Sequence, residues 1–170
     1  MINFKKTLVV SALLCVTAFA APTVGDKAVA FSFPELLKAE TKIQMKDYDK
    51  EVVLLNVWAS WCKGCKKEMP FFHKLGKKYQ PKNFTVLAVN IDKKADNAKA
   101  FINKLNANLE TQANITFAYD KKKSLPGTYE AKAVPFSLLI KNGKIIKSYL
   151  GSFDENNEHE LIADIEAAIK

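Results

Sequence analysis

The sequence has 170 residues, a formal net charge of +8 at pH 7 and 48% hydrophobic residues. This length favours one domain with its own hydrophobic core. The positive charge comes from lysine alone. Because arginine, the side chain that best suits phosphate and guanine recognition, is absent, we interpret the lysines as a solvated surface and expect no nucleic-acid partner.

The first 20 residues have the pattern of a secretory signal peptide. Lys5 and Lys6 give a basic start, residues 8–16 an apolar stretch, and residues 18–20 (Ala-Phe-Ala) a small-residue cleavage site. An uncleaved membrane anchor is the less favoured alternative, because the apolar run is shorter than the roughly 20 residues that a span needs. We therefore expect export to the periplasm or another extracytoplasmic space. The mature domain would be residues 21–170, with a net charge of +6 once the two lysines leave the total of +8.

Runs rich in β-branched and apolar residues predict strands, and apolar residues three or four positions apart predict helices. Strands are expected at residues 28–33, 42–45, 52–57, 84–91, 115–119, 136–140 and 144–150. Helices are expected from Lys66 onward, around Ala98 to Leu105, and around Leu161 to Ile169. The sum is a β-α-β unit with parallel strands followed by a β-β-α unit, in one α/β domain.

Local signals predict how these elements begin, bend and turn. Pro70 is expected to bend the helix that contains it. Asp92 or Asp96 is expected to cap the second helix, and Asp154 the last one. Residues 125–127 (Leu-Pro-Gly) predict a turn, and Asn142-Gly143 predicts a tight hairpin between the last two strands.

Two cysteines lie between the predicted strand at 52–57 and the helix that follows it. Cys15 would leave with the signal peptide, and a lipid anchor on it is disfavoured because Leu14 is bulky. The remaining pair, Cys62 and Cys65, closes a loop too short to constrain the unfolded chain much, so chemistry explains it better than stability. At a helix start, free backbone N–H groups and the helix dipole favour a thiolate on Cys62.

A Trp-Cys-x-x-Cys at the start of the first core helix resembles the thioredoxin fold, a central mixed β-sheet flanked by helices, here with a short N-terminal extension. In detail it is similar to the exported thiol–disulfide oxidoreductases of the TlpA/ResA/CcmG type. The segments that carry this resemblance are residues 53–62 (VLLNVWASWC), 65–70 (CKKEMP) and Val134-Pro135. Three positions depart from the pattern. Lys63-Gly64 stands where thioredoxins have Gly-Pro, so we expect it to tune the redox potential, and Phe136 stands where Thr or Ser is common.

The two cysteines and one glutamate are the expected catalytic residues. Cys62 would attack a client disulfide and form a mixed disulfide, which Cys65 would then resolve. Glu68 lies three residues after Cys65, so a helix places both on one face. The resemblance assigns to Glu68 the proton that Cys65 must lose, since Asn56 occupies the position where thioredoxins have an aspartate and cannot take a proton. The alternative is an ordinary solvent-facing glutamate.

Three residues are expected to bind the substrate. An X–Pro bond is trans by default, but the resemblance implies a cis bond between Val134 and Pro135. The backbone of Val134 would then pair with an extended client segment. Trp61 would shield Cys62 or offer an apolar docking surface, with core packing as the alternative.

These residues predict an exported reductase that keeps cysteines of client proteins reduced, apocytochrome c among them. By the same resemblance, a membrane-embedded thiol electron donor would re-reduce it. The alternatives are a disulfide oxidase or isomerase, and a copper-handling periplasmic protein with Cys62 and Cys65 as ligands. We expect no cofactor and no metal site. The sequence leaves the oligomeric state open, with a monomer as the expectation.

Overall fold

The computed structural model describes residues 20–107 and 115–170. The predicted signal peptide and Cys15 lie outside the described residues. A five-stranded sheet forms the centre, in the order β5-β4-β3-β6-β7. Its strands are β3 (Val52–Trp58), β4 (Phe84–Asn90), β5 (Ile115–Tyr119), β6 (Phe136–Lys141) and β7 (Lys144–Leu150). The pairs β3–β4 and β4–β5 are parallel, whereas β3–β6 and β6–β7 are antiparallel. The expected mixed sheet is confirmed.

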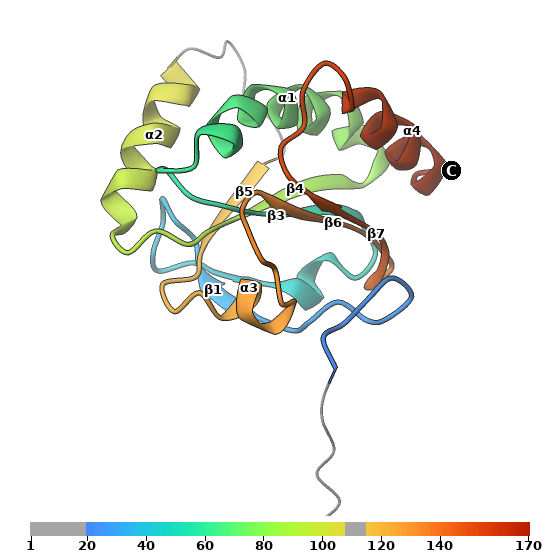
Figure 1. Cartoon of the computed structure of the whole chain (residues 1–170), viewed down its shortest axis with the longest axis horizontal. Coiled ribbons are helices and arrows are strands. Elements are labelled where there is room, and N and C mark those ends of the chain that lie inside the picture. The colour runs from blue at the N-terminus through green and yellow to red at the C-terminus, as the bar shows by residue number, and fades with distance from the viewer. Residues whose placement is uncertain (1–19, 108–114) are drawn as a thin grey trace, which may run out of the picture.

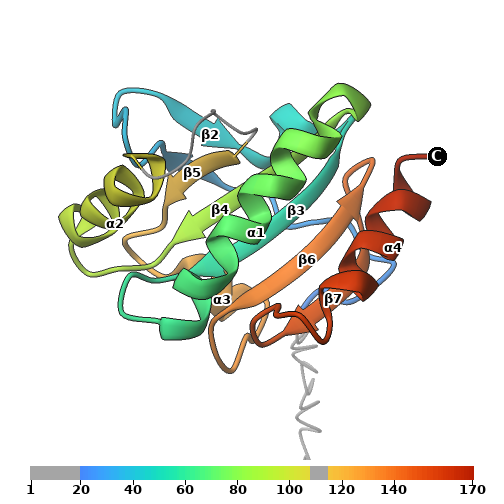
Figure 2. The same ribbon diagram turned by 90° about the horizontal axis from the view of Figure 1, so that it is seen from above.

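Helices cover one face of the sheet. Helix α1 (Lys63–Tyr79) lies across the middle strands, with α2 (Ala95–Ala107) on the β5 side and α4 (Glu158–Ala168) on the β7 side (Figures 1 and 2). Every residue of β3 and β4 is buried. Such strands are covered on both faces, which is why they read as unbroken apolar runs instead of alternating ones.

The N-terminal extension and the short helix α3 (Ser124–Thr128) cover the other face (Figure 1). Strands β1 (Ser32–Pro34) and β2 (Lys42–Gln44) pair with each other in a separate two-stranded sheet, followed by the 3-10 helix η1 (Met45–Tyr48). Isolated bridges join the extension to both edge strands, Lys27 to Lys144 and Glu35 to Ala118. The extension thus spans the sheet without adding a strand to it.

Several local predictions need correction. Helix α1 begins at Lys63, three residues earlier than the apolar spacing indicates. It contains Pro70, where the bend stays a prediction, and it runs on to the short helix η2 (Gln80–Lys82). Residues 125–127 lie within helix α3 and are not a simple turn, because proline is tolerated in the first turn of a helix. Strand β1 covers only the end of the expected 28–33 strand.

The predicted helix caps are also wrong. Asp96 lies inside the first turn of α2, and the carboxylate of Asp92 accepts a hydrogen bond from the backbone of Ser60 instead. Asn157, not Asp154, is the residue at the start of α4. The hairpin prediction is confirmed, since Asn142 and Gly143 join β6 to β7 with φ values of +51° and +71°.

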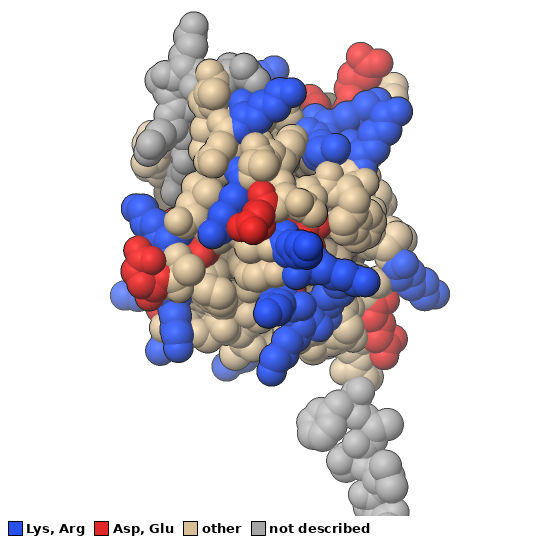
Figure 3. Space-filling view, turned by 90° about the vertical axis from the view of Figure 1, so that its left-hand side faces the viewer, with Lys and Arg blue, Asp and Glu red and all other residues tan. Residues whose placement is uncertain are grey.

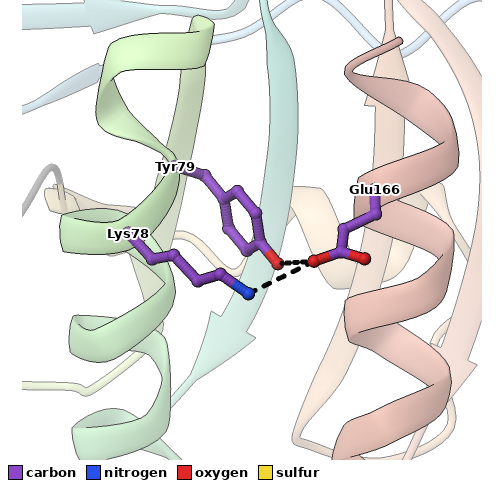
Figure 4. A network of polar contacts seen from close by, with 3 residues as sticks. All are labelled: Lys78, Tyr79 and Glu166. Atoms are coloured by element: carbon purple, nitrogen blue, oxygen red, sulfur yellow. Dashed lines mark hydrogen bonds and ion pairs between the residues drawn. The ribbon is translucent and has the colours of Figure 1, made fainter.

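The far end of α1 is joined to α4 at the surface. The Tyr79 hydroxyl donates a hydrogen bond of 2.6 Å to the Glu166 carboxylate, and the Lys78 ammonium lies 3.2 Å from the same oxygen (Figure 4). Tyr79 also packs edge-on against Phe84 of β4. These contacts hold the two helices side by side on the sheet, far along α1 from the cysteines.

Candidate active site

The cysteine pair lies at the first turn of α1. Cys62 is the N-cap residue, and its Sγ accepts a hydrogen bond from the Cys65 backbone N–H at 3.1 Å. The two cysteines form a disulfide with a Cα–Cα distance of 5.3 Å. Cys65 is fully buried, while Cys62 retains 7% of its surface. Cys62 is therefore the sulfur that a partner can reach, at a helix end where free N–H groups favour an anion.

A loop before β6 lies against the cysteines. The Val134–Pro135 peptide bond is cis, and the Val134 carbonyl oxygen is 3.6 Å from Cys62 Sγ. On the other side of Pro135, its carbonyl accepts a hydrogen bond from the Gly151 N–H at 3.0 Å. The segment after β7 thereby closes over the start of α1.

Gly64, between the two cysteines, has a packing reason to be glycine. A Cβ atom at this position would lie 3.1 Å from Ser152 Oγ and 3.8 Å from Pro135 Cδ. Its neighbour Lys63 is exposed. Of the two residues between the cysteines, one is thus fitted to the fold and the other faces the solvent.

Glu68 is a buried carboxyl group one turn of α1 after Cys65, so it is not the solvent-facing glutamate of the alternative interpretation. It retains 1% of its surface. The Asn56 side-chain N–H donates to Oε1 at 3.1 Å, and the Phe153 backbone N–H donates to Oε2 at 3.0 Å. Burial raises the pKa of Glu68 to about 8, although both hydrogen bonds act to lower it. Near neutral pH this group can therefore both hold and release a proton.

Asn56 and Ser137 form the floor of this buried polar cluster. They face each other across the β3–β6 pair, and Asn56 Nδ2 donates to Ser137 Oγ at 2.9 Å. Both residues are fully buried. Asn56 Oδ1 is also buried and has no hydrogen-bond partner among the described residues.

A second buried carboxylate holds the loop that leads into Cys62. The oxygens of Asp92 accept hydrogen bonds from the Ser60 N–H at 3.1 and 3.2 Å, and from the Asn90 side chain at 3.3 Å. Trp58, at the end of β3, is fully buried and its ring packs against Phe101 and Phe117. Trp58 is thus part of the core.

The surface around the cysteines is apolar close by and basic further out. Trp61 and Leu150 are 63% and 65% exposed, which excludes core packing for Trp61. Lysines 63, 93, 94 and 121–123 are exposed and follow the carboxyl ends of β3, β4 and β5, at the edge where α1 begins. Figure 3 shows that lysine side chains cover much of this edge and acidic ones little of it.

The described part of the chain offers no group of three or more His, Cys, Asp or Glu residues that could hold a metal ion. It also contains no helix long and apolar enough to cross a bilayer.

The structure brings together most of the residues that the sequence singled out. Cys62, Cys65 and Glu68 share one face of α1, while Pro135 and Ser152 close over its first turn. Sequence reasoning missed Ser137, Ser152 and the Phe153 N–H. Ser137 gave a faint signal, as the polar residue within an apolar strand next to Pro135; the other two gave none.

Comparisons with known proteins agree on one group. The family model described as Redoxin matches residues 23–167, which include both cysteines, Glu68 and Pro135. The thiol-disulfide oxidoreductase ResA of Bacillus thuringiensis (strain Al Hakam) is 35% identical over 129 residues, 75% of this chain and 70% of ResA. ResA of Geobacillus thermodenitrificans is 30% identical over 144 residues, 83% and 77% of the two chains. A solved structure of a thiol:disulfide interchange protein, DsbE from Chlorobium tepidum, has a TM-score of 0.77 and 34% identity, covering 87% of this chain and 99% of that one.

Proposed function

The chain belongs to the redoxin family and is a thioredoxin-fold thiol–disulfide oxidoreductase of the ResA/DsbE type, and we propose that it acts as an exported reductase of client-protein disulfides. The observation that carries the proposal is the pairing of the Cys62–Cys65 disulfide with a buried carboxyl group that titrates near neutral pH. A reductase of this kind needs a proton acceptor beside its second cysteine, and Glu68 has the position and the proton affinity for that task.

In the first step, the Cys62 thiolate attacks one sulfur of the client disulfide. A Cys62–client mixed disulfide forms, and the other client sulfur leaves as a thiolate. The place of Cys62 at the start of α1 favours its ionised form, and its partial exposure lets the client sulfur approach. Lys63, exposed next to it, adds a positive charge that acts in the same direction.

In the second step, Cys65 resolves the mixed disulfide. Glu68 takes the proton of the Cys65 thiol, and the resulting thiolate attacks Cys62 Sγ. The Cys62–client bond breaks, and the second client sulfur leaves as a thiolate. The client departs with two electrons from the enzyme, which is left oxidised with the Cys62–Cys65 disulfide seen here. Burial of Cys65 explains why it needs a local proton acceptor, since water does not reach it.

The client segment would dock along the loop that contains Pro135. The Val134 backbone lies beside Cys62 and offers hydrogen-bonding groups that accept an extended chain whatever its side chains. Trp61, exposed before Cys62, would provide apolar contact. This mode suits a reductase that serves several clients, apocytochrome c among them.

Export and re-reduction complete the proposal. The first 20 residues would act as a signal peptide, so the enzyme would work in an oxidising compartment. There it would need a continuous supply of electrons, which we assign to a membrane-embedded thiol donor.

The decisive measurement is the equilibrium reduction potential of the Cys62–Cys65 couple. A value near about −270 mV, that of thioredoxin, supports the reductase; a value near about −120 mV, that of DsbA, would make the protein a disulfide donor. Insulin-disulfide reduction by wild-type protein and by Cys62→Ser provides the second readout. A Cys62→Ser protein that keeps the activity would contradict the mechanism.

A further inference from the structure

The side chain of Asn56 makes an asymmetric set of contacts in the buried cluster. Its Nδ2 donates both of its hydrogens, one to Glu68 Oε1 at 3.1 Å and one to Ser137 Oγ at 2.9 Å. Its Oδ1 is buried and has no partner among the described residues. This arrangement suits an ionised Glu68, which can only accept hydrogen bonds.

A protonated Glu68 does not fit the same arrangement. The Phe153 N–H donates to Oε2 at 3.0 Å, and a backbone N–H cannot become an acceptor. The other group bonded to Glu68, Asn56 Nδ2, is also a donor, so the carboxyl O–H finds no acceptor among these partners on either oxygen. A buried O–H without an acceptor is costly.

We propose that Asn56 is a positioning residue whose side-chain amide turns over by 180° each time Glu68 takes up or releases the proton of Cys65. With Glu68 ionised, Nδ2 donates to the carboxylate and to Ser137. With Glu68 protonated, Oδ1 takes the place of Nδ2 and accepts from the Glu68 carboxyl and from the Ser137 hydroxyl, while Nδ2 moves to the buried position that Oδ1 now occupies. The inference rests on the proposed function insofar as Glu68 is the proton acceptor of Cys65.

Ser137 is what allows the amide to turn in place. A hydroxyl both donates and accepts, so it pairs with Nδ2 in one state and with Oδ1 in the other. An apolar residue at 56 would stabilise neither form of Glu68, and an aspartate would place a second negative charge beside it. Asparagine is the side chain that serves both protonation states without adding charge.

The surroundings of Glu68 contain few other charges that could set its titration. The ionisable residues of α1 nearest to it in the sequence are Cys65, the exposed Lys66 and Lys67, and His73; β7 adds Tyr149, and the exposed Asp154 follows that strand. The Tyr149 hydroxyl is engaged with Asp164 on α4. The raised pKa of Glu68 comes from burial, opposed by the hydrogen bonds from Phe153 and Asn56. Asn56 is thus the side chain through which the fold adjusts this pKa.

Neutron crystallography of the oxidised wild-type protein at pH 5.5 and pH 9.5 tests the proposal directly, because it locates the amide deuterons. We expect Oδ1 of Asn56 to face Glu68 at the lower pH and Nδ2 to face it at the higher pH. Glu68→Gln supplies a fixed mimic of the protonated acid and should hold the amide in the first orientation at both pH values. An amide that keeps one orientation across the wild-type pair overturns the inference.

Titration of the Glu68 carboxyl carbon by NMR gives an independent test. Asn56→Leu removes the donor from the carboxylate, so the midpoint should rise by about one pH unit, since a hydrogen bond to a charged group is stronger than one to a neutral group. Mixed-disulfide resolution should then slow about tenfold at pH 7 and recover at high pH, which a merely structural defect would not do. Ser137→Ala, the matched control, loses one contact in each state and should leave the midpoint nearly unchanged. An unmoved midpoint in Asn56→Leu would refute the role.

The two proposals can fail separately. A Glu68→Gln enzyme that resolves the mixed disulfide at the wild-type rate would overturn the proton-acceptor role, while the amide could still follow the Glu68 titration in the crystals. A static amide in an enzyme that does depend on Glu68 would overturn this inference alone.

Discussion

Two glutamates mark the two ends of α1, and they carry opposite pKa shifts. Glu68, near the cysteines, is buried, bonded only to uncharged donors, and has its pKa raised to about 8 by that burial. Glu166, on α4 opposite the far end of α1, accepts a hydrogen bond from the Tyr79 hydroxyl and pairs with Lys78, and these contacts lower its pKa (Figure 4). At one end of α1, the Glu68 carboxyl group can exchange a proton near neutral pH. At the other end, the Glu166 carboxylate stays ionised and joins α1 to α4.

The contrast shows how the fold assigns chemistry to identical side chains. Burial without a neighbouring cation leaves the charged form of Glu68 poorly stabilised, so the pKa of this carboxyl group rises towards neutral pH. The exposed Lys78 and the hydroxyl of the buried Tyr79 stabilise the charged form of the half-exposed Glu166 at little cost and little gain.

The largest expected effect is on stability as a function of pH. The folded pKa of Glu68 lies above its unfolded value of 4.5, so its contribution to stability is fully present below pH 4.5 and is lost as the pH rises through 8. The shift of about 3.5 units corresponds to at most about 5 kcal/mol. Glu68→Gln should abolish this loss, so the variant should exceed the wild type in stability at pH 9 by up to that amount. Urea unfolding of both oxidised proteins between pH 4 and pH 9 measures it.

A matched control separates the burial of Glu68 from the loss of one negative charge. Glu155→Gln removes the same charge from an exposed loop and should follow the wild-type curve. If the Glu155 and Glu68 variants behaved alike, the effect would come from overall charge and not from burial.

The next effect is on the rate of the second half-reaction. Removing a general base costs about 10²-fold or more, so Glu68→Gln should slow the release of a client from its Cys62 mixed disulfide by at least that factor near pH 8. The wild-type rate should rise with pH as Glu68 ionises, and the variant should lack that rise. Stopped-flow measurement of thiol release from a preformed mixed disulfide gives both rates. Glu166→Gln should retain the wild-type rate and profile.

Much of this site follows from sequence because its parts are local. The apolar run before Cys62, the helical spacing after it and the three-residue step to Glu68 place the reactive groups on one helix face. The hydrogen-bond partners of Glu68 cannot be predicted from the sequence in this way. Phe153 lies 85 residues further along the chain, and Ser137 lies 81 residues beyond Asn56. Only the folded chain brings these residues together.

The same limit explains the errors at the helix ends. The first turn of α1 carries Lys63 and Gly64, which contribute nothing to an apolar stripe, and its cap is a cysteine instead of the usual Ser, Thr, Asp or Asn. Asp92 has the right type and place for a cap, yet the fold uses it to hold the Ser60 backbone. A carboxylate's preferred partner is set by what packs against it, which local sequence does not reveal.

A smaller effect on stability should come from substituting Gly64, which lies in the tightly packed first turn of α1 between the two cysteines. In Gly64→Ala the new Cβ would lie 3.1 Å from Ser152 Oγ, so Ser152 must shift and the loop over α1 with it. Overpacking of this kind costs roughly 1 to 2 kcal/mol. Thermal unfolding should show the loss, and the double variant Gly64→Ala with Ser152→Gly should recover most of it. A double variant no better than the single one would place the strain elsewhere.

The smallest effect belongs to the far end of α1. Lys78→Gln removes the cation beside Glu166 on a surface that water and salt screen, so the melting temperature should fall by at most about 3 °C and the difference should vanish in 1 M salt. Because the folded pKa of Glu166 is lowered, the contribution of its ionised form is present above its ordinary pKa of 4.5 and is lost as the pH falls through the folded value. Acid therefore weakens this contact under the same conditions that favour the protonated Glu68. If Lys78→Gln altered the rate of client reduction, the two ends of α1 would be coupled. Catalysis could then no longer be assigned to the surroundings of Glu68 alone and helix packing to those of Glu166 alone.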